Sequence, residues 1–139
     1  MAKTTKKKTP DAELASGLLD QDRQRAAEKE EAIKKEKARL KKAFKDLDGN
    51  KKKTVEQLIS TAAFLSVTLR DLEDEINRCG VTEEYQNGAN QYGVKQSAAA
   101  VTHIAMTKNL TAIMKQLTDL VPAEKKKKSR LQELSAALR

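Results

Sequence analysis

Aromatic residues are almost absent from this sequence, which has two Tyr, two Phe and no Trp among 139 residues. Charged residues make up 35% of the chain and apolar residues only 38%, below the usual share for a soluble domain. Ordering each residue costs roughly 1–2 kcal/mol of backbone entropy, and there is little apolar surface to offset that cost. We therefore expect part of the chain to lack a core of its own and another part to complete its core with other copies.

Cysteine, proline and glycine are also scarce. The single Cys79 excludes an intramolecular disulfide and fits a reducing compartment. Two Pro and five Gly favour long helices, and the shortage of β-branched and aromatic runs argues against a sheet. No apolar run approaches the roughly 18 residues of a membrane span, and the basic N-terminus lacks the apolar stretch of a secretory signal. The sequence thus predicts a soluble, intracellular, all-α protein.

The net charge of +8 is unevenly distributed along the chain. Residues 1–53 hold 17 Lys/Arg against 10 Asp/Glu, residues 54–121 hold 5 against 8, and residues 122–139 hold 6 against 2. The whole positive excess therefore lies outside the middle segment. Two basic flanks around a mildly acidic middle are typical of a scaffold with polyanion-binding arms. The alternative is that the lysines only keep an assembling protein soluble.

Composition and hydrophobic spacing divide the chain into four parts. We expect a basic flexible tail over residues 1–17 and a charged long helix with a basic turn over residues 18–53. A helical-hairpin oligomerisation core is expected over residues 54–121, followed by a basic C-terminal arm over residues 122–139. The predicted fold is a long N-terminal helix plus an antiparallel helical hairpin, with basic disordered termini.

The long N-terminal helix has one plausible start and one clear end. Thr9-Pro10-Asp11 has a hydroxyl cap, a first-turn Pro and an acid, all typical of a helix start, although Gly17 weakens the stretch that follows. Residues 18–47 are strongly helix-forming, and Asp48-Gly49-Asn50 predicts the end of the helix.

Two further helices form the expected hairpin. Thr54 resembles the cap of a second helix, and Gly80 stands where a left-handed residue ends one. Residues 81–97 are predicted to be a polar connector, after which Ser97 opens a third helix that Pro122 closes. Helices of about 24 residues, roughly 36 Å long, would then lie antiparallel.

The second helix has an apolar arc wider than one stripe. A single hairpin buries one face of each helix, and large exposed apolar patches are rare on monomers. We therefore expect self-association, with symmetric closure into a ring or dimer. The candidate oligomerisation residues are Phe64, Val67, Leu69, Tyr85, Asn87, Asn90, Tyr92, Ile113 and Leu117.

No pattern of catalytic or metal-binding residues is found. The segment from Asp46 imitates a calcium loop, but Lys51 stands where the loop needs Gly and Gln57 where it needs Glu. One Cys and one His are too few for a zinc site, and no glycine-rich phosphate loop is present. His103 is expected to be packed or interfacial. We therefore expect no enzyme activity, no catalytic residue, no metal and no cofactor.

The connector is the most distinctive stretch, since neither core packing nor solubility requires its sequence, which runs from Glu84 to Ser97 as EYQNGANQYGVKQS. Together with residues 62–69 before it and residues 115–122 after it, the connector resembles the interhelical segment and flanking helices of phage terminase small subunits, a family of tailed phages and prophages. The resemblance extends over about residues 40–124.

The resemblance implies a non-catalytic subunit of a viral genome-packaging terminase. Such subunits form homo-oligomeric rings, here expected to have about eight to eleven copies. They engage double-stranded viral DNA in the host cytoplasm, with no membrane involved, and regulate a large subunit that supplies the ATPase and nuclease activities. The alternative is a small helical adaptor that binds a protein partner, with lysines serving only solubility.

DNA contact is expected at the hinge between the long helix and the core. The basic segments lack interleaved aromatics, so phosphate contact is indicated and base stacking is not. Whether arms or a ring surface hold the DNA is left open by the sequence. The residues expected to contact DNA are Lys34, Lys35, Arg39, Lys41, Lys42, Lys45, Lys51, Lys52 and Lys53.

Overall fold

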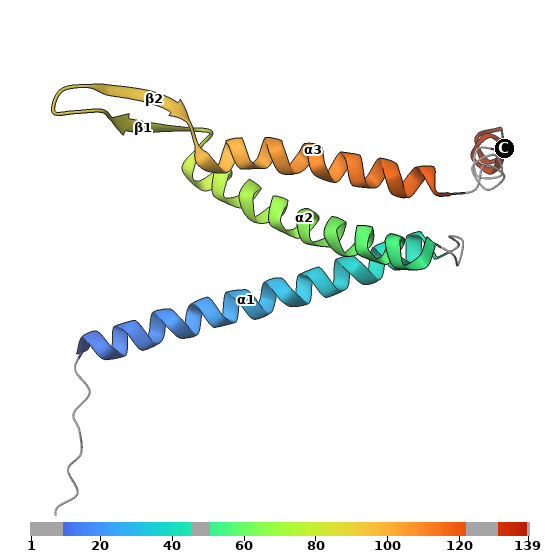
Figure 1. Ribbon diagram of the computed structural model, residues 1–139, viewed down its shortest axis with the longest axis horizontal. Coiled ribbons are helices and arrows are strands. Elements are labelled where there is room, and N and C mark those ends of the chain that lie inside the picture. Colours follow the sequence, from blue (N-terminus) through green and yellow to red (C-terminus); the bar gives the residue numbers. More distant parts are fainter. Residues whose placement is uncertain (1–9, 46–50, 122–130, 139) are drawn as a thin grey trace, which may run out of the picture. The chain divides into compact units, whose positions relative to one another are not determined.

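The computed structural model describes residues 10–45, 51–121 and 131–138, and it is mostly helical with one small sheet (Figure 1). Its elements are α1 (Pro10–Ala43), α2 (Lys52–Cys79), β1 (Thr82–Gln86), β2 (Tyr92–Gln96) and α3 (Ala98–Asp119), and residues 131–137 form a short C-terminal helix. The chain divides into two units, Met1–Ala32 and Ile33–Arg139. The predicted helical character is confirmed, but the connector is a β-hairpin.

In the first unit, residues 10–32 of α1 form a solvated helix. The helix starts at Pro10, as predicted, with Asp11 and Glu13 in its first turn, where acids interact favourably with the helix dipole. Residues 10–17, which the sequence boundaries assigned to a flexible tail, are therefore helical. Leu14, Leu18 and Leu19 remain 59–68% exposed, so no described residue covers them.

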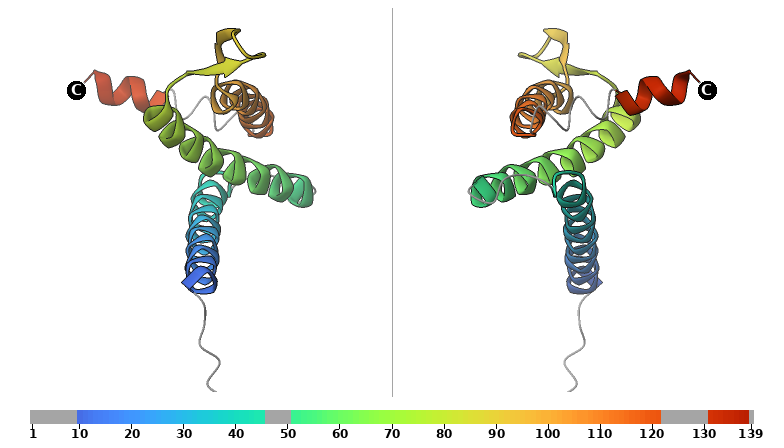
Figure 2. Two further views of the ribbon diagram at one scale, coloured as in Figure 1. Left: turned by 90° about the vertical axis from the view of Figure 1, so that its left-hand side faces the viewer. Right: turned by 90° about the vertical axis from the view of Figure 1, so that its right-hand side faces the viewer.

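The second unit is built around α2. Its core joins Leu40 from the last turns of α1, Val55, Ile59, Ala62 and Ala63 from α2, and Leu117 from α3. The buried positions of α2 span a wide arc because α1 contacts one side of the helix and α3 the other. Figures 1 and 2 show α3 returning beside α2 and inclined to it, which confirms the predicted helical hairpin.

Two of the three predicted signals at the ends of these helices are confirmed. Ser97 caps α3, because its Oγ accepts a hydrogen bond of 3.2 Å from the backbone N–H of Ala100. Gly80 ends α2 with a φ of +92°, a conformation that favours glycine. The predicted cap Thr54 is wrong, because α2 begins earlier, at Lys52, and Lys51 takes the cap position without a side-chain hydrogen bond.

The structure describes only some of the predicted ends of the first and third helices. α1 ends at Ala43, before the predicted limit at Leu47. The expected stop at residues 48–50 and the expected closure of the third helix at Pro122 lie outside the described residues, as do residues 1–9 and the lysine run 125–128.

The predicted connector instead folds into two antiparallel strands. β1 pairs with β2 from Thr82 opposite Gln96 to Gln86 opposite Tyr92, and residues 87–91 turn the chain. On one face, the Tyr85 ring lies over Gly93, where a Cβ atom would meet ring atoms at 2.7 Å. Lys95 pairs with Glu83 at 3.1 Å on the same face. These local contacts stabilise a ribbon that extends beyond the ends of α2 and α3 (Figure 1).

Candidate nucleic-acid interface

The candidate interface is the place where α1 ends and α2 begins. Leu40 of α1 packs into the core with Val55 and Ile59 of α2, which holds the two helix ends together. Lys41 and Glu56 form an ion pair of 2.8 Å across the same junction. A groove of about 350 Å³ lies between the helix ends, and its basic lining residues are Lys41, Lys45 and Lys52.

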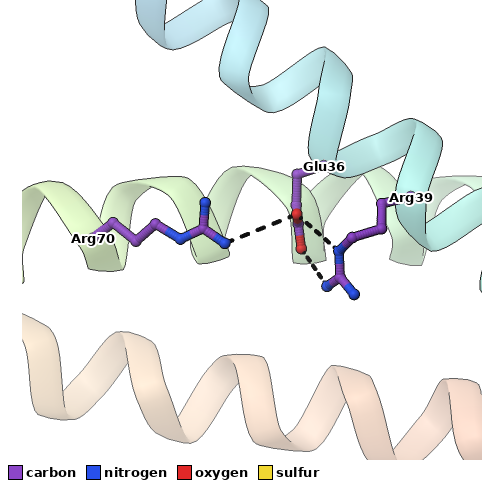
Figure 3. A network of polar contacts seen from close by, with 3 residues as sticks. All are labelled: Glu36, Arg39 and Arg70. Carbon is purple, nitrogen blue, oxygen red and sulfur yellow. Dashed lines mark hydrogen bonds and ion pairs between the residues drawn. The ribbon is translucent and has the colours of Figure 1, made fainter.

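A buried carboxylate, Glu36, forms a second contact between α1 and α2, one turn before Leu40 in α1 (Figure 3). Glu36 has a side chain only 8% exposed, and it accepts hydrogen bonds of 3.0 Å and 2.6 Å from the guanidinium of Arg39. Arg70 of α2 approaches Oε2, the oxygen that accepts from Nε of Arg39, at 4.0 Å. The hydrogen bond from Arg39 holds the pKa of Glu36 below its ordinary 4.5, against the desolvation that would raise it. The Arg70 contact adds an electrostatic attraction between the last turns of α1 and α2.

The packing of α1 determines which of its lysines face solvent. Ile33, Glu36 and Leu40 recur at intervals of three and four and lie on the face toward α2. At 100° per residue, the basic positions predicted to contact DNA fall on the opposite face or its flanks, whereas Lys37 lies nearer the face toward α2 and is half-buried. All of these predicted contact residues are exposed: Lys34, Lys35, Lys42 and Lys45, with Arg39 and Lys41 at the flanks.

The start of α2 adds three more positive charges, one at the cap residue and two in the first turn. Lys51, Lys52 and Lys53 are exposed, and the turn contains no acidic residue. Positive charge at a helix N-terminus opposes the helix dipole, whereas an anion there is stabilised by the dipole and by free backbone N–H groups. This part of the chain is therefore electrostatically suited to a phosphate group.

Arg39 and Lys41 of the predicted DNA-binding set have acidic partners. Arg39 binds Glu36, and this contact raises the pKa of the Arg39 guanidinium. Lys41 donates to Glu56, and that hydrogen bond lowers the pKa of the Glu56 carboxyl. Their charges are partly neutralised, so Lys42, Lys45 and the lysines of α2 are the stronger candidates for phosphate contact.

Acidic and basic residues are also separated along α1. The charge count over residues 1–53 as a whole does not reveal this separation. Residues 10–32 contain seven Asp/Glu and three Lys/Arg. Residues 33–53 contain ten Lys/Arg and three Asp/Glu. The basic character of the N-terminal flank is thus concentrated around the junction of α1 and α2, which is where the sequence placed the DNA contacts.

The predicted oligomerisation residues fall into two groups. Val67, Leu69 and Leu117 are 4%, 7% and 0% exposed and Ile113 is half-buried, so these residues pack mainly within one chain. Phe64, Tyr85 and Tyr92 are 47%, 41% and 74% exposed, and the Asn side chains of the hairpin turn are exposed too. The latter group alone offers substantial surface to a second copy: Phe64, Tyr85, Asn87, Asn90 and Tyr92.

Other kinds of site have little support in the described residues. Within residues 10–45, 51–121 and 131–138, no group of three or more His, Cys, Asp or Glu is arranged to hold a metal ion. In the same part of the chain, no helix combines the length and apolar character needed to cross a membrane. His103 is partly buried, and its Nε2 lies 3.1 Å from Oε1 of Glu73.

Sequence reasoning missed the residues that hold the interface in place. Glu36 carries no signal in the sequence that sets it apart from the other acidic residues of α1, because its partner Arg70 is distant in sequence. The β-hairpin had a readable signal, because Asn87-Gly88 lies between two short runs containing Thr, Tyr and Val. Gly88 has a φ of +107° in the turn.

The sequence was compared with protein-family models and curated proteins, and the fold with solved structures, and none of these comparisons found a match.

Proposed function

We propose that this chain is a non-catalytic DNA-binding protein, the small subunit of a viral genome-packaging terminase. The observation that carries the proposal is the exposed lysine cluster where α1 meets α2, held by the Leu40 packing and the Lys41–Glu56 ion pair. The resemblance of the connector and its flanking helices supplies the viral context. The partners are double-stranded viral DNA and a terminase large subunit that provides the ATPase and nuclease activities in the host cytoplasm.

The lysine cluster binds DNA through backbone phosphates. Its side chains are long, flexible and positively charged. The aromatic residue among them, Phe44, is half-buried and packs against the core, so it is not presented for stacking between bases. The logarithm of the binding constant for duplex DNA then falls with the logarithm of salt concentration, by about 0.9 for each phosphate contacted. This mechanism gives affinity without sequence recognition, so site selection requires further contacts.

Self-association completes the proposed function. The exposed Phe64, Tyr85 and Tyr92 provide contact surface, and a cyclic homo-oligomer of about eight to eleven copies would repeat the lysine cluster around a ring. Repetition increases affinity for a polymeric anion because several clusters can engage one duplex at once.

The test compares two double variants for duplex DNA binding by fluorescence anisotropy across a salt series. Lys52→Gln/Lys53→Gln removes two charges from the cluster, whereas the control Lys108→Gln/Lys115→Gln removes two exposed charges from α3. We expect the first variant to weaken binding and to reduce the salt slope by about 1.8, and the control to change the slope much less. Equal effects of the two pairs would contradict the assignment of the cluster.

Native mass spectrometry of the full chain tests the assembly. A ring mass together with salt-dependent DNA affinity supports the terminase role. A monomer without salt-dependent affinity would instead favour the adaptor function, with lysines serving solubility.

A further inference from the structure

A second groove lies at the other end of the helical hairpin, where α2, the β-hairpin and α3 meet. Its volume is about 530 Å³, within the range of roughly 300–1,000 Å³ typical of binding pockets. Ile76 of α2, Val81 before β1 and Ile104 of α3 form its apolar lining. Its polar lining consists of Glu73 and His103, which pair at 3.1 Å, together with Asn77 and Gln96.

The apolar lining of this groove is only partly covered by the chain. Val81 is 59% exposed and Ile104 is 48% exposed, although both border the same hollow. The surroundings are acidic, since residues 71–84 contain six Asp/Glu and one Arg. A matching occupant would present apolar side chains from a positively charged segment.

The C-terminal segment of this chain has both properties. Leu131, Leu134 and Leu138 are 65%, 60% and 86% exposed. Leu131 and Leu134 lie on one face of the C-terminal helix, and Leu138 follows its last residue at the spacing that continues this face. Residues 122–139, which include this helix, carry six Lys/Arg and two Asp/Glu. Apolar and charge complementarity therefore point to the same pairing.

We propose that the leucine face of the C-terminal helix docks into the groove of a second copy. The groove is lined by Ala100, His103 and Ile104 of α3, whereas the C-terminal segment follows the far end of this helix at Asp119, about 23–29 Å away at 1.5 Å per residue. Docking within one chain would use more than half of the reach of residues 120–130, which is at most about 3.6 Å per residue. Docking into a neighbouring chain does not require residues 120–130 to span this distance.

This contact is heterologous, because it joins two different surfaces. Repeated from copy to copy, it closes a ring if the rotation between neighbours allows closure. The docking contact would thus explain how copies associate, and only its closure into a ring rests on the proposed function. DNA binding by the lysine cluster is a separate property.

Cross-linking tests whether the pairing occurs between chains. Cys79 is the single cysteine, is exposed, and follows closely after Asn77 of the groove. Ser135→Cys places a second thiol on the leucine side of the C-terminal helix, and a bis-maleimide reagent can bridge the two. We expect a ladder of dimers, trimers and larger species on a denaturing gel. The matched control Ser16→Cys puts the second thiol on α1 and should give far less of the larger species.

Removal of the leucines tests the apolar contact. The variant Leu131→Ser/Leu134→Ser/Leu138→Ser should lose the cross-linked ladder and reduce the solution mass measured by light scattering. Its control is Leu14→Ser/Leu18→Ser/Leu19→Ser, which changes three comparably exposed leucines of α1. All six side chains are exposed, so circular dichroism should show folded protein in both cases.

The groove variant Val81→Ser/Ile104→Ser completes the design. Mixed in equal amounts with the leucine variant, it should form dimers, since the mixture retains one intact helix face and one intact groove. A full chain that is monomeric, a cross-link confined to single chains, or an unchanged mass of the leucine variant would each overturn the docking. Salt-dependent DNA binding can persist in all three cases, so failure of this inference is distinguishable from failure of the proposed function.

Discussion

At the scale of single residues, the informative side chain is Glu36. A carboxylate that is 8% exposed loses hydration, a cost that hydrogen bonds must offset. Arg39 provides two such bonds from the same helix, and Arg70 adds an attraction from α2. Arg39 and Arg70 are about two-thirds exposed, so the network is a buried anion held by solvated cations.

Glu36→Gln should lower the free energy of unfolding of the second unit by about 1–3 kcal/mol at neutral pH, because charge-assisted hydrogen bonds are replaced by weaker neutral ones. Urea denaturation followed by circular dichroism measures the change. Glu28→Gln, at an exposed position bonded to Gln24, is the matched control and should change stability by less than about 0.5 kcal/mol.

The effect of Glu36→Gln on the free energy of unfolding should depend on pH. The folded-state pKa of Glu36 is lowered from 4.5, so its stabilising effect is complete above the unfolded-state pKa. That effect is lost as pH falls through the lower folded-state value. The stability difference between wild type and Glu36→Gln should therefore be constant near neutral pH and shrink below about pH 4.5. A difference that stays constant down to pH 2 would show that the carboxylate charge is unimportant.

At the scale of elements, the long helices were predictable and the short hairpin was missed. The period of the apolar residues in α2 and the capping Ser97 depend on residues that are close in sequence, so both could be predicted and both are present in the fold. The β-hairpin depends on cross-strand contacts, such as Tyr85 over Gly93, that a composition argument against sheet could not weigh. Its Asn-Gly turn was the available clue.

The candidate interface was predictable in part for a similar reason. Lysine positions and helix phase follow from sequence, so the exposure of Lys42 and Lys45 could be expected. The pairing of Lys41 with Glu56 joins two helices and depends on how they pack. The burial of Leu117 likewise depends on how α3 packs against α2 and the last turns of α1.

The two predicted helix caps provide a direct comparison between a confirmed and a wrong signal. Ser97→Ala should cost about 1 kcal/mol, because the N–H of Ala100 loses its acceptor at a buried position. Thr54→Ala should cost less than about 0.5 kcal/mol, because Thr54 lies inside α2 and alanine favours helix. Urea denaturation of both variants measures the difference. Equal losses would indicate that Thr54 caps α2 in solution.

At the scale of the whole molecule, the acidic residues of the first half of α1 should influence DNA binding at the lysine cluster through long-range electrostatic repulsion. Asp22 and Lys34 are only twelve positions apart in the sequence. The Debye length is about 8 Å at physiological salt and about 30 Å at 0.01 M. The acidic half of α1 should therefore repel DNA bound at the lysine cluster in dilute salt, and this repulsion should be largely screened at physiological salt.

Asp20→Asn/Asp22→Asn should raise affinity for duplex DNA several-fold at about 0.01 M salt and by less than about twofold at 0.15 M. The pair of Asp20 with Arg23 is exposed and 3.9 Å long, so its loss should not disturb the helix. The control Glu84→Gln/Asp119→Asn makes the same change in net charge at exposed positions of β1 and α3. Anisotropy titrations of both variants separate position from net charge. A larger gain for the α1 pair identifies the lysine cluster as the bound surface, whereas equal gains at every salt concentration would mean that only the total charge matters.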